Sequence, residues 1–178
     1  AANVTANNIG QYGGTTRRCN IFGASFNNST STYLTSLTSL RTFKARSCGI
    51  TSWDMPFPNS IEIIDLSTQT LDTTGNNTYT TFNFQRCPTV ININLFGNYN
   101  TGTLNTIQNL NSLTRVEIVD IQGNSFTNFN NLFSGAATQY FPSTLKNSIL
   151  SRNNFAAPDW TREFFTTSGT LALQQLFR

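Results

Sequence analysis

The chain has 178 residues, of which 38% are hydrophobic and only 11% are charged. This length and apolar content are sufficient for one domain with a hydrophobic core, and they exclude a disordered polymer. The net charge of +3 is too small to indicate nucleic acid binding by itself. No stretch approaches the roughly 18 consecutive apolar residues that a membrane-spanning helix needs, so we expect no membrane insertion.

Histidine is absent, and the three cysteines, Cys19, Cys48 and Cys87, lie far apart with no C-x-x-C pair. The commonest general base and metal ligand is therefore missing, and the cysteine spacing does not fit a zinc site. We expect neither a metal nor another cofactor. Polarity comes instead from 24 Asn and 28 Thr, residue types that favour turns and strands respectively. The chain begins at Ala1 without Met, so we expect a processed chain or part of a longer protein.

Residues 1–15 are polar and contain three glycines, which predicts an extended lead-in or N-terminal cap. After them, six segments fit the pattern L-x-x-L-x-L-x-x-N-x-L, in which L is apolar and N is Asn or a substitute. In chain order the residues at the L and N positions are Thr16, Cys19, Ile21, Ala24 and Phe26; Leu40, Phe43, Ala45, Cys48 and Ile50; Ile61, Ile64, Leu66, Gln69 and Leu71; Val90, Ile93, Leu95, Asn98 and Asn100; Val116, Val119, Ile121, Asn124 and Phe126; and Leu145, Ser148, Leu150, Asn153 and Phe155. Thr16, Asn100 and Ser148 depart from the pattern.

The N positions recur at spacings of 24, 21, 29, 26 and 29 residues, in keeping with one coil per motif. Each motif predicts a short strand with alternate apolar side chains inward, followed by an Asn whose amide bonds the backbone of the neighbouring coil. Stacked coils would form one parallel sheet over a continuous core. The alternative is a run of unrelated short strands that share a period of two.

The segments that return the chain between motifs differ in length and composition. Pro56 and Pro58 exclude a long helix in residues 51–60, whereas apolar spacing in residues 105–112 predicts one or two helical turns. We therefore expect irregular loops and short helical turns on the convex side. Beyond Phe155 the pattern stops, and residues 157–178, with Asp159 as a possible helix N-cap, predict a C-terminal cap. The alternative for this segment is a tail that docks on another chain.

The sixfold motif resembles that of the leucine-rich repeat superfamily, over roughly residues 14–156. The resemblance implies an α/β solenoid of the leucine-rich repeat type, with a curved parallel β-sheet and a mostly irregular or short-helical convex side. It divides the chain into an N-terminal cap (1–15), six coils (16–156) and a C-terminal cap (157–178). It also implies that the sheet face binds proteins or glycans, although a fold does not specify an activity.

Charge is concentrated on the outward positions of the predicted strands. Eleven of the 19 charged residues fall on the thirty x positions of the six L-x-x-L-x-L-x-x-N cores. The first two coils are basic, the middle coils acidic and the last basic, with apolar residues interspersed. The predicted binding residues on this face are Arg18, Arg41, Lys44, Arg46, Glu62, Asp65, Asn94, Phe96, Glu117, Asp120, Gln122 and Arg152. The alternative is that these charges only pair across strands, as Lys44 opposite Asp65 would.

These observations favour a non-enzymatic recognition or assembly module that uses the sheet face. The expected partner is a protein or another copy of the chain, with a glycan as a further possibility. Low charge and abundant Asn and Thr favour an exterior location: a cell surface, a secreted protein or a virion. The first alternative is a purely structural subunit of a larger assembly such as a virus particle. The second is a glycan-active β-solenoid enzyme, in which Glu62 with Asp65, or Glu117 with Asp120, would act as paired acids.

Overall fold

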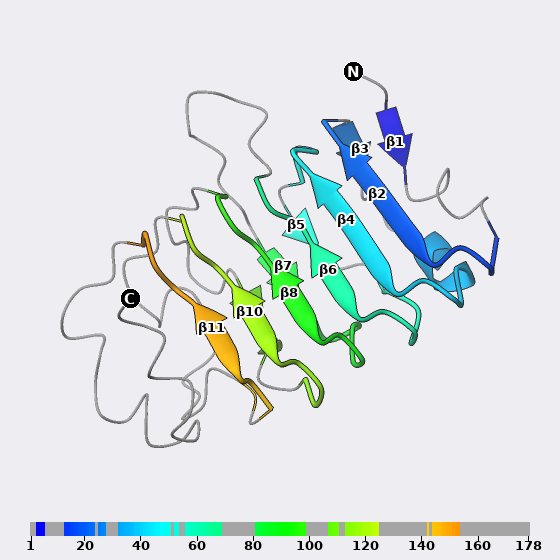
Figure 1. Cartoon of the computed structure of the whole chain (residues 1–178). Coiled ribbons are helices and arrows are strands. Elements are labelled where there is room, and N and C mark those ends of the chain that lie inside the picture. The colour runs from blue at the N-terminus through cyan, green and yellow to red at the C-terminus, as the bar shows by residue number, and fades with distance from the viewer. Residues whose placement is uncertain are drawn as a thin grey trace.

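Each of the six predicted motifs forms a short strand, because alternate apolar side chains suit a chain buried on one face only. In the computed structural model these strands lie side by side in one sheet (Figure 1). They are β2 (Arg18–Phe22), β4 (Thr42–Arg46), β6 (Ile63–Asp65), β8 (Asn92–Asn94), β10 (Ile118–Asp120) and β11 (Asn147–Ile149). The structure describes residues 3–5, 13–23, 25–27, 32–50, 52–53, 56–68, 81–98, 107–110, 113–124, 142 and 144–153.

All neighbouring strands of this sheet are parallel, in the order β11-β10-β8-β6-β4-β2. The register aligns the fourth position of every motif, and this column consists of Cys19, Phe43, Ile64, Ile93, Val119 and Ser148. The predicted parallel alignment of six strands in one phase is confirmed. The chain is a parallel β-solenoid.

The inward residues form a continuous core. Phe43, Ile64, Ile93 and Val119 are fully buried, and even the polar Ser148 is only 5% exposed. Where the interior is wide, aromatic rings fill it: Phe43 packs against Trp53 and Phe57 with ring centroids 5.3 and 5.2 Å away.

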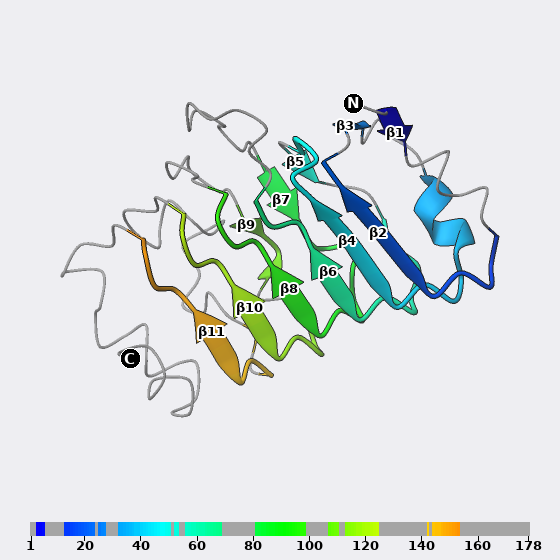
Figure 2. The ribbon, with the colours of Figure 1, turned by 45° about the horizontal axis from the view of Figure 1, so that its top comes forward.

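A second, three-stranded parallel sheet lies on the return side of the coils. Its strands are β5 (Ser52–Trp53), β7 (Thr81–Asn83) and β9 (Ile107–Gln108), in that order. In Figure 2 this smaller sheet lies behind the larger one. Trp53, Phe82 and Ile107 bury their side chains in the core, so the interior is enclosed by strands on both sides.

The predicted helical turns of residues 105–112 are replaced at Ile107–Gln108 by strand β9, whereas Leu110 is in a 3-10 helical conformation. Ile107 and Leu110 are both buried, as a helix would require, but Ile107 belongs to β9. Asn109 then adopts a positive φ of 61°. This turn points the side chain of Leu110, three residues after Ile107, into the core. Among the described residues, 3-10 conformation occurs in η1 (Thr32–Ser36) and at Leu110. In the described residues, the return side of the solenoid therefore contains strands and turns with almost no helix.

Near the N-terminus, β1 (Asn3–Thr5) pairs in parallel with β3 (Ser25–Asn27). Part of the predicted lead-in thus forms a two-stranded sheet with the segment after β2. The predicted C-terminal cap, residues 157–178, lies outside the described residues. Within the part of the chain that the structure describes, no helix has the length and apolar character to cross a membrane.

Asparagine side chains tie the coils together as predicted. Asn98 Nδ2 donates to the Leu66 carbonyl of the preceding coil at 3.2 Å, Asn124 Nδ2 to that of Leu95 at 3.0 Å, and Asn153 Nδ2 to that of Ile121 at 2.9 Å. Asn98 and Asn124 are buried. Each amide therefore satisfies a carbonyl that would otherwise lack a partner where the strand ends.

A second ladder, which the motif did not predict, uses the hydroxyl just before the first apolar residue of three coils. Ser60 Oγ donates to the Leu40 carbonyl at 2.7 Å, and Thr89 Oγ1 donates to that of Ile61 at 3.0 Å. Thr144 Oγ1 donates to the Val116 carbonyl at 2.7 Å. Part of the Ser and Thr content therefore serves to join the starts of neighbouring coils.

Candidate functional site

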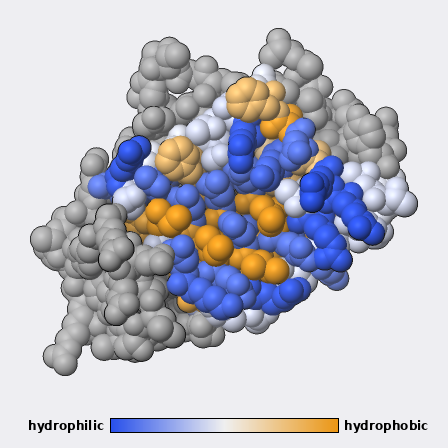
Figure 3. All heavy atoms as spheres, viewed as in Figure 1, coloured by the Kyte–Doolittle hydropathy of each residue, from blue (hydrophilic) through white to orange (hydrophobic). Residues whose placement is uncertain are grey.

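The outward side chains of the six-stranded sheet form aligned rows because the strands share one register. The middle row consists of Asn20, Lys44, Asp65, Asn94, Asp120 and Ile149. The row at the strand starts consists of Arg18, Thr42, Ile63, Asn92, Ile118 and Asn147. Figure 3 shows that hydrophobic groups run across the middle of this face, with hydrophilic groups on both sides.

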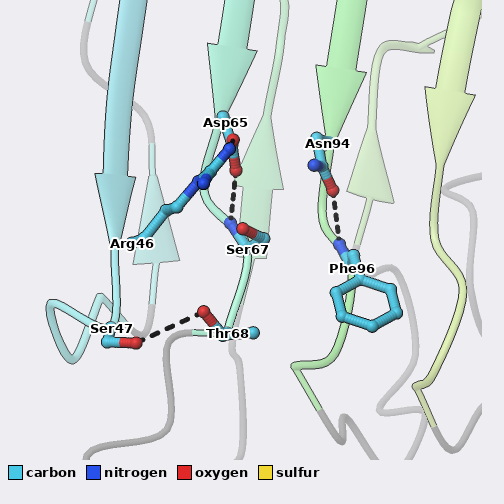
Figure 4. A network of polar contacts seen from close by, with 7 residues as sticks. All are labelled: Arg46, Ser47, Asp65, Ser67, Thr68, Asn94 and Phe96. Carbon is cyan, nitrogen blue, oxygen red and sulfur yellow. Dashed lines mark hydrogen bonds and ion pairs between the residues drawn. The ribbon is translucent and has the colours of Figure 1, made fainter. Parts of the chain in front are cut away.

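Three polar residues of the middle row end their own strands. The Ser67 amide donates to Asp65 Oδ1 at 3.1 Å, the Phe96 amide to Asn94 Oδ1 at 2.9 Å, and the Gln122 amide to Asp120 Oδ1 at 2.9 Å. Figure 4 shows the first two contacts. Such a bond from a side chain to the backbone two residues on turns the chain. These predicted binding residues therefore have a structural role in the fold.

Asp65 is also less accessible than its outward position predicts. Only 3% of the residue is exposed. Arg46 of the preceding coil contacts its carboxylate, with Nε and Nη2 at 2.8 and 2.6 Å from Oδ2 (Figure 4). The neighbouring coil therefore covers Asp65 and pairs its carboxylate with Arg46, and the role of Asp65 in binding stays a prediction.

Two further ion pairs join neighbouring coils: Arg41 contacts Glu62, and Lys146 Nζ lies 2.8 Å from Glu117 Oε1. Lys44 does lie opposite Asp65 in the register, but the carboxylate bonds Arg46 instead. Pairing across strands therefore accounts for five of the predicted binding residues, namely Arg41, Arg46, Glu62, Asp65 and Glu117.

The suggested acid pairs have different surroundings from those of two free carboxylates. Glu62, Asp65 and Glu117 each face a cation. Burial raises the pKa of Asp120; the hydrogen bond from the Gln122 amide lowers it, and the charge of Asp65 raises it further. Among the residues that the structure describes, no group of three or more acidic or cysteine side chains is arranged to hold a metal ion.

A pocket of about 500 Å³ opens at the N-terminal end of the sheet face, and we call it the cationic pocket. It brings together three predicted residues, Arg18, Lys44 and Arg46. Its lining consists of Arg18, Asn20, Ile21, Phe22, Thr42, Lys44, Arg46 and Ile63. No carboxylate lines it, and neither Arg18 nor Lys44 forms an ion pair within the described residues.

Phe22 is the large apolar side chain that most clearly departs from core packing. It is 79% exposed at the end of β2, directly opposite Arg46 in the register. Phe22 and Ile63 are among the apolar residues that the sequence places at outward strand positions, but the predicted binding set included neither of them, nor Asn20 or Thr42.

A second pocket of about 680 Å³ lies where the later strands begin. It is lined by Ile91, Thr114, Arg115, Glu117, Thr144, Leu145 and Lys146. Of the predicted binding residues it contains Glu117, which Lys146 neutralises. Thr144 is already bonded to the Val116 carbonyl. This pocket therefore offers less uncompensated charge than the cationic pocket.

The remaining predicted residues do not join the cationic pocket. Asn94, Phe96 and Gln122 are partly buried on the middle coils, and Arg152 is exposed in the last coil, at the opposite end of the sheet. The structure thus separates the predicted face into a basic end, a middle whose charges are paired, and a distant basic residue.

In comparisons with known proteins, no family model matches this chain and no curated protein matches it.

Proposed function

We propose that this protein is a non-enzymatic recognition module, built on a leucine-rich-repeat-like solenoid, that binds a partner through the cationic pocket. The observation that carries the proposal is the pairing of uncompensated charge with an exposed aromatic ring. Arg18 and Lys44 have no acidic partner among the described residues, and Phe22 beside them is 79% exposed.

Binding a partner there would be favourable for two physical reasons. Covering Phe22 removes apolar surface from water, which contributes about 25 cal/mol per Å² before the costs of association. The two free cations would attract an acidic partner and orient it before contact. Arginine and aromatic side chains are also the residue types on which binding energy concentrates in protein interfaces.

The composition supports an exterior location for this module, on a cell surface, in secretion or on a virion. Charged residues make up only 11% of the chain, while Asn, Ser and Thr supply most of its polarity. In this proposal no catalytic step is assigned, because three of the four suggested acids are held in ion pairs between coils.

A structural subunit is the second candidate, and a specific observation favours it. Three ion pairs and the Asn ladder join neighbouring coils, and polar side chains of the sheet form turns at the strand ends. Such a face is suited to holding a rigid shape. The molecular mass in solution distinguishes the two candidates, since an obligatory assembly would not persist as a monomer at micromolar concentration.

The experiment that tests recognition is selection from a random peptide library on the folded chain. The test variant is Arg18→Glu/Lys44→Glu, and Arg46 is left unchanged because it neutralises Asp65. The control is Arg86→Glu/Arg115→Glu, which makes the same charge change at exposed positions outside the cationic pocket. We expect the wild type and the control to enrich the same peptides and the test variant to lose them. Enrichment that survives in the test variant would contradict the proposal.

A further inference from the structure

The three cations of the cationic pocket lie at successive levels along the strand direction. In the register Arg18 lies opposite Thr42, so Arg18, Lys44 and Arg46 occupy the levels of residues 42, 44 and 46. Each step of two residues along a strand is about 6.7 Å. The charges therefore extend over about 13 Å, and they lie on only two neighbouring strands, β2 and β4.

From this spacing we propose that the cationic pocket binds an extended acidic segment of a protein, with carboxylates at alternate residues. The inference rests on the proposed function and specifies its partner. An extended chain presents every second side chain on one face with the same period of about 6.7 Å. Carboxylates at residues i, i+2 and i+4 of such a segment would therefore meet the three cations in turn.

The width of the charged line also matches one extended chain. Two neighbouring strands are about 4.8 Å apart, whereas a helix with its side chains is 10–12 Å across. A helix over β2 and β4 would also cover β6, whose outward residues Ile63 and Asp65 offer no cation to its acidic side chains. An extended segment along β2 and β4 keeps its carboxylates over the three cations.

Arg46 is already oriented to bind a carboxylate of the partner in addition to Asp65. Its Nε and Nη2 contact Asp65 Oδ2, and Nη1 makes no bond to a described residue. A guanidinium that is held on one side keeps donors for a second carboxylate on the other. Part of the entropic cost of ordering this long side chain is therefore met before the partner arrives.

Apolar groups flank the charged line at both ends, which favours a peptide over a sulfated glycan. Ile63, half-buried, lies at the level of Arg18, and Phe22 lies at the level of Arg46. Apolar side chains of a peptide on either side of its acidic residues would cover them. A sulfated glycan would gain from the three cations but would leave Phe22 exposed.

The test uses two labelled peptides of identical composition and the full chain, with binding followed by fluorescence anisotropy. The first, Leu-Glu-Thr-Glu-Thr-Glu-Leu, alternates its acids; the second, Leu-Thr-Glu-Glu-Glu-Thr-Leu, clusters them. We expect the alternating peptide to bind at least fivefold more tightly than the clustered one. Arg18→Gln/Lys44→Gln should weaken its binding at least tenfold, while Arg86→Gln/Arg115→Gln should leave it unchanged.

Equal affinity for the two peptides, or no binding of either, would overturn this inference. The inference would also be overturned if a sulfated heparin-type tetrasaccharide bound more tightly than the alternating peptide and lost its binding in Arg18→Gln/Lys44→Gln. The partner would then be a glycan. If library selection still depended on Arg18 and Lys44 in these cases, the proposed recognition function would stand without the acidic segment. Arg18→Gln alone, at an exposed position, supplies a second variant whose fold is not at risk.

Discussion

Arg46 and Asp65 form an ion pair between neighbouring coils in which the carboxylate has two tasks. Its Oδ2 lies 2.8 Å from Arg46 Nε, and its Oδ1 accepts the Ser67 amide at 3.1 Å. Asp65 is 3% exposed, whereas 46% of the Arg46 side chain is exposed. The pair therefore links the end of one strand to the turn that follows the next.

Removing the positive charge of Arg46 alone should destabilise the fold more than removing the charges of both Arg46 and Asp65. We expect Arg46→Gln to lower the free energy of unfolding by about 1–3 kcal/mol, because a buried carboxylate loses its partner. Asp65→Asn keeps the oxygen that accepts the Ser67 amide, as Asn94 does in the next coil. The double variant Arg46→Gln/Asp65→Asn should recover most of the loss. Urea unfolding measures all three, and a double variant less stable than Arg46→Gln would contradict this account.

The asparagine ladder should be one of the strongest polar contributions to stability. Asn124 Nδ2 donates to the carbonyls of Leu95 at 3.0 Å and Ile121 at 2.8 Å, and the residue is 5% exposed. Asn124→Ala should cost about 1–3 kcal/mol in urea unfolding, because buried carbonyls lose a donor. Asn20→Ala, at an exposed position of the sheet face, is the control and should change stability by less than about 0.5 kcal/mol. Equal losses at the two sites would mean that the ladder is not stabilising.

Two glycines at the same place in their coils should differ in their tolerance of alanine. Gly97 and Gly123 have φ of 66° and 69°, so either substitution should cost about 1–2 kcal/mol for the left-handed backbone. A Cβ on Gly97 would also lie 3.2 Å from Thr68 Cγ2, whereas on Gly123 it would meet atoms at 3.5 Å. Gly97→Ala should therefore be the more destabilising in thermal unfolding.

The background variant Thr68→Ser isolates this contact. It removes Cγ2 but keeps the hydroxyl that lies 3.3 Å from Ser47 Oγ. In this background the costs of Gly97→Ala and Gly123→Ala should become equal. A difference that persists would show that the Thr68 methyl group is not its source.

Stability should depend on pH through Asp120. Burial first, and the charge of Asp65 to a smaller extent, raise the pKa of Asp120 above its ordinary value of 3.8, although the Gln122 amide opposes this. The folded state thus holds the proton more tightly than the unfolded chain does. The resulting stability is fully present below pH 3.8 and is lost as the pH rises through the folded pKa.

Asp120→Asn should remove the loss of stability at higher pH while keeping a side-chain oxygen that accepts the Gln122 amide. We expect the variant to be more stable than the wild type at pH 7 and equal to it at pH 3, as measured by thermal unfolding. Asn94→Asp is the converse variant, because it places a third carboxylate between Asp65 and Asp120 in the middle row. It should be destabilised at pH 7. A variant Asp120→Asn that is less stable than the wild type at pH 7 would contradict the raised pKa.

The cysteines should react slowly in the folded chain. Burial, and to a smaller extent Cys48, raises the pKa of the Cys19 thiol to about 11, and Cys48 and Cys87 are buried. At pH 8 the thiolate fraction of Cys19 is then roughly a hundredfold below that of an ordinary thiol. Iodoacetamide should label all three cysteines readily in urea and none at a comparable rate in the folded chain. Fast labelling of Cys19 without denaturant would contradict its burial.

The sheet and its register could be predicted because side chains along a strand alternate between the buried face and the outer face, and this alternation (the parity of a position) fixes how strands align. In a strand with one buried face, a slip of one residue would turn every apolar side chain outward. Ile64, Ile93 and Val119 are therefore sufficient to align three strands, and the structure aligns them so. The Asn ladder follows from the same alignment.

Parity does not show how far an outward side chain is covered by the next coil. Asp65 and Lys44 have the same outward parity, yet Asp65 is buried because Arg46 lies over it. The return side was harder still, since the spacing of Ile107 and Leu110 fits a helix as well as a strand with a turn. The positive φ of Asn109 ends strand β9 before Leu110, and no local sequence pattern specified this turn.

The backbone position with positive φ that follows each strand of the larger sheet is marked in the sequence by glycine in only some coils. Glycine stands there in three coils, and the remaining coils have other residues in the same conformation. The six residues are Gly23, Ser47, Thr68, Gly97, Gly123 and Arg152. Because half of them are not glycine, composition alone did not reveal a conformation that all six coils share.

The account depends on one parallel register, since it places Arg18, Lys44 and Arg46 together on the outer face. The most direct measurement is methyl NOE spectroscopy of the core column formed by Ile64, Ile93 and Val119. The account predicts strong cross-peaks from Ile93 to both neighbours, which lie on strands about 4.8 Å to either side. Absence of these cross-peaks, or strongest contacts from Ile93 to residues outside the column, would contradict the register and the binding site built on it.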